Sequence, residues 1–316
     1  MNPIIRTIAV GVFWLLVAAP ASPTGVAARN FVLTIGGQQA GYLSSFKGGN
    51  AVGEVVKVTG PTSIAKKHLA NIHYEPITIE VGIGMSKPLS DWLVSMLRGT
   101  QAPTNGAVLV LDSQMKVVQE LNFSAALITS VSFPKLDGSS KDAARVTLEI
   151  TPNTVVTTKG SGAVVTTPSV KQKSSLESSF RFELDGLDTK RVTKIEAFTI
   201  KQKLLTEAVG GMRETIPKPG ELEIPNIRVS FSAASLEPWT RWFEEFVLRG
   251  INDDRHEKQG RIVLLGPNLK DELLTLTLSN IGIFALREYQ AAANNDAIGP
   301  VEADLYIERM ELSAKP

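Results

Sequence analysis

The sequence predicts a mainly β protein of the α+β type. We expect a tandem duplication of a small β-barrel or sandwich, with one flanking amphipathic helix in each copy. Three observations predict this: short alternating apolar runs end at glycine turns, the same order of runs occurs twice, and each half contains a single helical stripe. The 316 residues are also enough for about two domains.

Residues 1–28 are typical of a signal peptide. Arg6 precedes the uncharged run Ile8–Ala19, and small residues stand before Arg29. This run has 12 residues, whereas about 20 are needed to span a bilayer. An uncleaved anchor or a wrongly assigned start is the alternative. Cleavage predicts an exported chain, periplasmic or extracellular, with no membrane span in the mature protein; without cleavage we expect cytoplasmic assembly.

The two copies begin with similar strand patterns. Phe31–Gly37 parallels Phe180–Gly186 at a separation of 149 residues, and both alternate apolar residues before a glycine turn. Ile77–Val81 parallels Ile227–Phe231 at a separation of 150 residues. Repeated elements in the same order indicate duplication of one fold rather than two unrelated β domains.

A helix follows in each copy, with apolar residues at positions i, i+3, i+4, i+7 and i+8, which places them on one face toward a core. Each helix opens near a proline and closes at Arg-Gly, as expected for helix ends. The stripe residues are Leu89, Trp92, Leu93, Met96 and Leu97 in the first copy and Trp239, Trp242, Phe243, Phe246 and Val247 in the second.

Further strands complete each copy. We expect domains at residues 29–150 and 179–316, joined by a Ser/Thr/Gly-rich linker at residues 151–178. The alternative is an ordered arm that pairs with a neighbouring chain, because Val155–Val156 and Val164–Val165 have β character. The later strands are expected near 106–111, 117–123, 126–133 and 145–151, and near 260–265, 273–279, 281–286 and 301–308.

The sequence contains few residues suited to catalysis or metal binding. Cysteine is absent, and the three histidines, His68, His73 and His256, show no metal-ligand spacing. No phosphate-binding loop or nucleophile elbow occurs. The polar run Asp253–Glu257 is best interpreted as a solvated loop. We therefore assign no catalytic, cofactor-binding or metal-ligating residue and expect no enzyme and no cofactor.

Charge is nearly balanced. The formal net charge is +1, which gives no general electrostatic basis for binding nucleic acid. Residues 29–150 hold 11 basic and 9 acidic residues, whereas residues 179–316 hold 18 and 22. The opposite signs suggest the hypothesis that chains meet head to tail.

The first copy resembles the tail tube proteins of contractile phages and their relatives in phage-like injection systems, including the tube protein of type VI secretion. The order of a strand, an amphipathic helix with an Asp-Trp pair, a loop and two strands carries the resemblance. The second copy lacks the Asp-Trp pair and is more distant. The matching segments are Phe31–Gly37, His73–Gly84, Leu89–Leu93, Asn105–Asp112 and Leu121–Ala126.

The resemblance implies a structural subunit that forms six-fold rings stacked into a tube within a sheath, with sheath or baseplate proteins as partners and no catalytic residue. Duplication suggests that three chains make a pseudo-six-fold ring. A signal peptide is unusual for such a subunit. The alternative is therefore an exported binding module of tandem β domains that has reused the fold without forming a tube.

Overall fold

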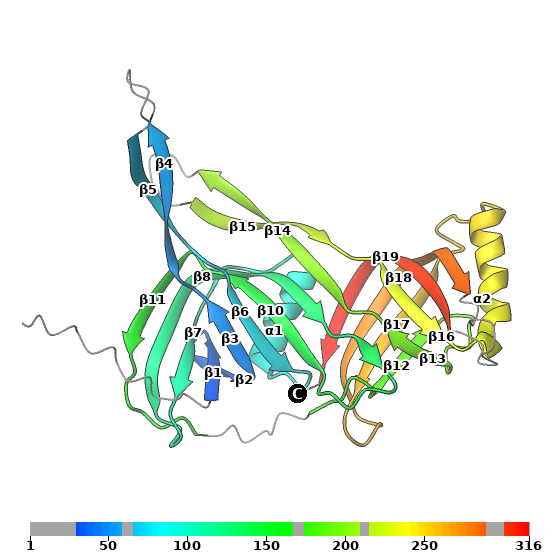
Figure 1. Ribbon diagram of the computed structural model, residues 1–316, viewed down its shortest axis with the longest axis horizontal. Helices are drawn as coiled ribbons and strands as arrows, with labels where there is room; N and C mark the ends of the chain where they lie inside the picture. Colours follow the sequence, from blue (N-terminus) through cyan, green and yellow to red (C-terminus); the bar gives the residue numbers. More distant parts are fainter. Residues whose placement is uncertain (1–29, 59–65, 167–173, 209–214, 289–299, 316) are drawn as a thin grey trace, which may run out of the picture.

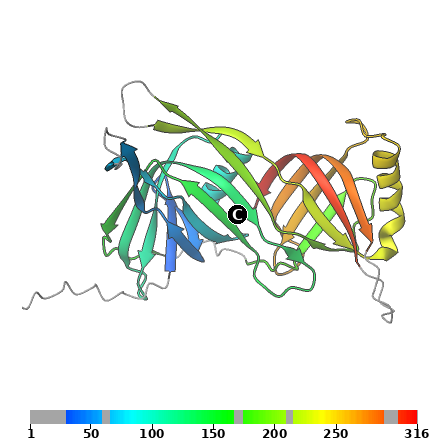
Figure 2. The same ribbon diagram turned by 45° about the horizontal axis from the view of Figure 1, so that its top comes forward.

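The structure, a computed structural model, describes residues 30–58, 66–166, 174–208, 215–288 and 300–315. The two copies lie side by side along the long axis of the molecule, with the N-terminal strands at one end and the C-terminal strands at the other (Figures 1 and 2). The proposed signal peptide, residues 1–28, lies outside the described residues.

The first copy contains eleven strands and one helix within its described residues. Alternation of apolar and polar residues, as in Ile77–Gly82, buries one face of each such strand. The elements are β1 (Asn30–Ile35), β2 (Gln38–Leu43), β3 (Ser45–Gly48), β4 (Ala51–Val58), β5 (Lys66–Tyr74), β6 (Ile77–Gly82), α1 (Lys87–Leu97), β7 (Thr104–Leu111), β8 (Val117–Phe133), β9 (Leu136–Asp137), β10 (Arg145–Thr151) and β11 (Thr154–Lys159).

The second copy has eight strands among its described residues, and its helix ends in a π-helical turn. Its elements are β12 (Phe180–Leu184), β13 (Val192–Ile195), β14 (Phe198–Ala208), β15 (Thr215–Glu223), β16 (Ile227–Phe231), a 3₁₀ turn (Ala233–Ser235), α2 (Leu236–Phe243), the π turn (Glu244–Leu248), β17 (Lys258–Leu265), β18 (Glu272–Glu288) and β19 (Val301–Ala314).

The strand order is the same in both copies. The first sheet contains the order β1-β7-β8-β10-β6-β3, and the second contains β12-β17-β18-β19-β16-β13. Strand β19 pairs along the length of β18, and β10 and β11 together pair along the length of β8. Strand β19 therefore corresponds to β10 and β11 combined. The mainly β fold predicted from the repeat is therefore confirmed.

Backbone irregularities also recur at matching positions. The pairing of β7 with β8 shifts between Thr104 and Gly106, and that of β17 with β18 shifts between Lys258 and Gly260. The hairpin β4–β5 shifts after Gly53, and the hairpin β14–β15 shifts after Gln202. Bulges are built features of a sheet rather than defects. Because the bulges recur, they show which residues of the two copies are equivalent. Equivalent residues differ by about 149 in number between the two hairpins and by 155 between β8 and β18.

The segment expected to be a linker is ordered in its first part. Residues Thr154–Lys159 form β11, which pairs with β8 and places Val155 opposite Phe123. Val155 is buried, because its side chain lies on the face of the strand that packs against the core, whereas that of Val156 faces outward. The expectation of a linker from residue 151 is thus wrong for this strand, which completes the first copy. The alternative arm pairs within its own chain; residues 167–173 lie outside the described residues.

One apolar core runs through both copies. Buried side chains from α1, β6, β8 and β10 are continuous with those from β14, β16, β18 and β19. The two copies are therefore not independent domains joined only by a linker, and we expect the folding of one copy to depend on the other.

Gly282 in β18 supports the Tyr306 ring of β19. A Cβ atom at position 282 would overlap this ring, whose hydroxyl donates a 2.7 Å hydrogen bond to Glu257. We expect Gly282→Ala to lower the free energy of unfolding by about 1–3 kcal/mol through overpacking. Gly82→Ala is the matched strand control, because no atom lies within 4 Å of its new methyl group. Equal urea midpoints for the two variants would contradict this prediction.

Candidate functional site: the joint between the two copies

A β-strand of the second copy extends the sheet of the first. Strand β14 pairs antiparallel with β8, placing Thr199 opposite Ser132 and Ile200 opposite Val131. In the reverse sense, β9 of the first copy pairs with β13 and forms the edge of the second copy's sheet. The hairpin β14–β15 consequently reaches over the first copy (Figure 1). Strand addition to an open sheet edge is a standard mode of recognition between proteins, used here within one chain.

Apolar side chains close the joint beneath this pairing. The rings of Phe133 and Phe198 stack with centroids 5.0 Å apart, and both are buried. Val131 and Ile200 are also fully buried. Aromatic stacking adds to the gain from burying apolar area, so these residues bind the two copies firmly.

Two buried amides specify the alignment of the joint. The Gln101 side-chain nitrogen donates to the Gln202 side-chain oxygen and, at 2.8 Å, to the carbonyl of Ile128. The Ile128 amide donates in return to Gln101, and Gln202 donates to the carbonyl of Gly220 at 3.1 Å. Each glutamine is only 4% exposed. Because both are hydrogen-bonded, they can be buried without the penalty of an unsatisfied polar group.

Helix α1 lies between the copies (Figures 1 and 2) and packs on β19 of the second copy as well as on β8 of its own. Its residues Leu93 and Leu97 are buried. The corresponding residues of the second copy are Phe243, at the end of α2, and Val247, in the π turn, and both are less covered. Val247 is 38% exposed, against 7% for Leu97. The prediction that Val247 belongs to a buried stripe is therefore wrong, because α2 packs on β18 of its own copy and its other face is open.

Asp304 anchors a charged cluster on the second copy. Its carboxylate accepts hydrogen bonds of 2.6 Å from Arg228 Nε and from Arg287 Nη1. Burial alone would raise its pKa, but the hydrogen bonds from Arg228 and Arg287 outweigh that effect and lower the pKa below the usual range. The corresponding positions of the first copy hold Thr78 and Glu149, so this cluster distinguishes the copies.

A lowered pKa in the folded state gives a stability contribution that is complete above the unfolded pKa of about 3.9 and is lost as the pH falls through the folded pKa. We expect Asp304→Asn to remove this part of the acid dependence. At neutral pH the substitution should cost about 1–2 kcal/mol, because charge-assisted hydrogen bonds are lost from partly exposed arginines. Urea unfolding at pH 7 and pH 3.5 tests this; an unchanged pH slope would argue against it.

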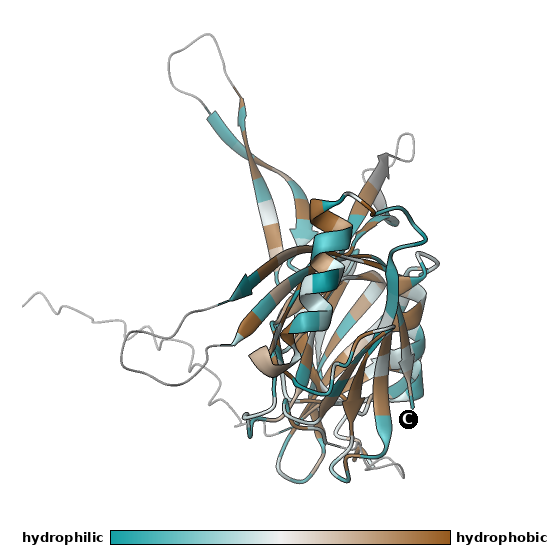
Figure 3. Cartoon of the chain, turned by 90° about the vertical axis from the view of Figure 1, so that its right-hand side faces the viewer, coloured by the Kyte–Doolittle hydropathy of each residue, from teal (hydrophilic) through white to brown (hydrophobic). Residues whose placement is uncertain are grey.

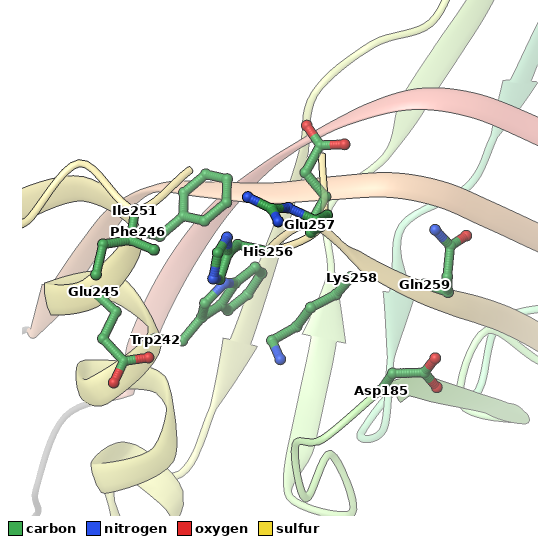
Figure 4. Close-up of a pocket in the computed structure, with 10 residues that line it drawn as sticks. Asp185, Trp242, Glu245, Phe246, Ile251, His256, Glu257, Lys258 and Gln259 are labelled. Carbon is green, nitrogen blue, oxygen red and sulfur yellow. The ribbon is translucent and has the colours of Figure 1, made fainter. Parts of the chain in front are cut away.

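A pocket of about 300 Å³ lies beside the end of α2 (Figure 4). The Lys258 ammonium sits 5.2 Å from the centre of the Trp242 ring. Burial lowers the pKa of Lys258, while the carboxylates of Asp185 and Glu245 act in the opposite direction. The lining includes both acidic and basic side chains, so its charges do not single out an anion or a cation as ligand. Its lining residues are Asp185, Trp242, Glu245, Phe246, Ile251, Arg255, His256, Glu257, Lys258 and Gln259.

The polar residues singled out in the sequence do not converge. His68 and His73 are exposed on β5, whereas Asp253 and His256 lie in the exposed loop after the π turn of the other copy. Hydrogen bonds from Arg255 and His256 lower the pKa of Asp253 to about 2. Within the described part of the chain, no group of three His, Asp or Glu side chains is arranged to hold a metal ion.

Gln101 and Gln202, the central polar residues of the joint, are not predicted from the sequence pattern. One signal was present: Gln202 continues the inward alternation of Phe198 and Ile200 and so places an amide where an apolar residue is expected. Gln101, in a loop, offers no comparable signal.

No helix among the described residues has the length and apolar character of a membrane span.

These features describe a protein made of two like β units, in which hydrogen-bonded and apolar contacts join one unit to the other. Residues 27–155 match the family of the T4-like virus tail tube protein gp19. The first copy is therefore similar to a tail tube protein, and this match supports a structural, tube-like role for the chain. The second copy shares its strand order.

Several solved structures are similar to part of the chain. The cap that terminates the tube of the anti-feeding prophage is 16% identical, with a TM-score of 0.39, covering 47% of this chain and 100% of that chain. A chain of an extracellular contractile injection system, in its sheath–tube complex, is 17% identical with a TM-score of 0.38, covering 43% and 93%. A chain of the sheath/tube terminator of such a system is 18% identical with a TM-score of 0.37, covering 44% and 99%. No curated protein matches the chain.

Proposed function

We propose that the chain is a non-enzymatic subunit that assembles with copies of itself into rings or a tube of a phage-like injection apparatus. Three chains would supply six similar positions in a ring. The observation that carries this proposal is the joint in which β14 of one copy extends the β8 edge of the other. The match of residues 27–155 to the tail tube family supports the same role.

The joint is head to tail, because β8 and α1 of one copy meet β14 and β19 of the next. A heterologous contact of this type repeats until it closes into a ring or continues as a filament. The second copy carries its own counterparts of β8 and α1, namely β18 and α2, and can therefore receive another unit. We further propose that proteins of a sheath or baseplate bind the outside of such a ring.

Electron microscopy and mass photometry of residues 29–316 test this function. We expect closed rings with the mass of three chains, either free or stacked, at micromolar concentration. A particle that stays a single chain at the highest soluble concentration would refute self-assembly. A variant with the internal joint weakened, Phe198→Ala, is the control that should lose regular rings.

Export is a separate part of the proposal. We propose that residues 1–28 are removed and that the mature chain begins at Arg29, on the basis of the uncharged run Ile8–Ala19 and the small residues that follow. N-terminal sequencing of the protein recovered from cell fractions gives the result directly. An intact residue 1 in assembled particles would show that assembly does not require export.

A further inference from the structure

We propose that strand β4 of a second copy of this chain pairs with the open edge of β18, and that this second copy also covers the exposed face of α2. The contact between chains would thus repeat, residue by residue, the joint within the chain. This inference rests on the proposed self-assembly and names the surfaces that carry it.

The C-terminal half of β18 has one free edge. Strand β17 pairs with β18 only as far as Ile281, whereas β19 pairs on the opposite edge as far as Glu288. Among the described residues, no strand pairs with the β17 side of Gly282–Glu288. In the first copy the same edge of β8, at Ser130–Phe133, is occupied by β14. Phe284, 43% exposed, lies on this open stretch.

The hairpin β4–β5 is the counterpart of β14–β15 and lacks the covering that β14 receives. It forms a separate two-stranded sheet at the far end of the molecule from α2 (Figure 1). Exposed apolar residues lie along it: Leu69 is 75% exposed, and Val55 and Ile72 are also largely exposed. Hydrophobic segments are visible on the hairpin that stands highest in Figure 3. A raised apolar hairpin with unpaired edges is a surface that proteins otherwise protect.

Helix α2, at the front of Figure 3, presents the second half of the contact. The exposed apolar residues lie at its C-terminal end: Val247 and Leu248 are in the π turn, Ile251 lies just beyond it, and Leu248 is 69% exposed. The matching face of α1 is covered by β19. The counterpart of β19 in a second copy is β10 with β11, and β11 offers the exposed Val156. The β18 edge would thus meet β4, and the helix face would meet β10 and β11. All three strands belong to the first copy of a second chain, so both contacts require the same partner in the same orientation.

The repeated bulges predict the register between chains. Since Gly53 corresponds to Gln202, Asn50 corresponds to Thr199 and Val52 to Lys201. Since β8 and β18 differ by 155 positions, Arg287 corresponds to Ser132 and Ala285 to Ser130. We therefore expect Asn50 opposite Arg287 and Val52 opposite Ala285.

The contact between chains differs chemically from the one within the chain. Glu288 and Gly49 occupy the places of the stacked Phe133 and Phe198, and Gly53 occupies that of Gln202. The outer contact thus has neither the stacked rings nor the paired glutamines. It should form reversibly and only in the presence of enough protein, whereas the inner joint is permanent.

Engineered cysteines test the register, because the natural chain has no cysteine. Four single variants are made: Asn50→Cys, Val52→Cys, Ala285→Cys and Arg287→Cys. Mixtures of two variants are oxidised and run on non-reducing gels. We expect disulfide-linked dimers for position 50 with 287 and for position 52 with 285. The crossed mixtures, 50 with 285 and 52 with 287, should give about ten-fold less, since each is displaced by two residues, beyond the reach of a disulfide.

The variant Ser132→Cys/Thr199→Cys is the positive control, because these residues pair within one chain and their hydroxyls lie 2.8 Å apart. The Ala285 pair also tests the register without disturbing the hydrogen bond of Arg287 to Asp304. Rings in micrographs without register-selective dimers would overturn this inference and leave the proposed function standing. Absence of both rings and dimers would overturn both, and equal yields from all four mixtures would overturn the register.

Discussion

Trp239→Ala is expected to lower the free energy of unfolding by about 3–5 kcal/mol. Trp239 is fully buried and stacks on Phe231 with ring centroids 4.5 Å apart, next to Trp242 at 6.1 Å. Its removal would leave a cavity between α2 and β16 that the surrounding strands cannot fill without shifting. Urea unfolding followed by far-ultraviolet circular dichroism measures the loss.

Two further variants show what the ring contributes. The Trp239 indole nitrogen is buried and has no hydrogen-bond partner in the described structure, so Trp239→Phe should cost much less than the alanine change. Leu248→Ala, on the adjoining exposed turn, should change stability by no more than about 0.5 kcal/mol in a dilute monomer. Similar losses for Trp239→Ala and Leu248→Ala would show that the α2 face does not form a core.

Phe198→Ala is expected to cost about 3–5 kcal/mol and to act on the joint between the copies. The side chain is buried and stacks on Phe133 across that joint. Hydrogen exchange should therefore quicken first in β14 and in the C-terminal part of β8. The double variant with Phe133→Ala should show a coupling energy of about 0.5–1.5 kcal/mol.

Leu205→Ala is the control on the same strand, because Leu205 lies beyond the joint and is 57% exposed. If Phe198→Ala lowered stability but left exchange at the joint unchanged, the two copies would be held together mainly by α1 and β19. If Phe198→Ala and Leu205→Ala had equal effects, burial at the joint would not be the source of stability.

Sequence patterns were most informative where contacts are local. The helical stripe from Leu89 to Leu97 and the alternation in Ile77–Val81 place side chains on a face by period alone, and the structure buries those residues. The pairing of β14 with β8 joins residues about 67 positions apart. Periodicity specifies which face of a strand is buried but not which strand lies beside it, so this joint could not be predicted from the pattern.

Val247 shows that a helical pattern can also predict burial where the structure leaves a side chain exposed. Its spacing matches that of Leu97, so the pattern predicts equal burial, yet only Leu97 is covered. The difference arises because α1 packs on β19 of the other copy, whereas the second helix packs on β18 of its own copy. In the proposed assembly, a second chain would cover Val247.

The duplicated strand order also determines how a partner would meet a ring of these chains. The cluster of Asp304 with Arg228 and Arg287 belongs to the second copy alone, since Glu149 and Thr78 stand at the matching places of the first. Such a ring would carry this cluster at every second position. A protein that recognises the shared backbone shape would find six equivalent sites, whereas one that recognises the charged cluster would find three. If three chains form the proposed ring, that ring would offer binding sites of both three-fold and six-fold arrangement.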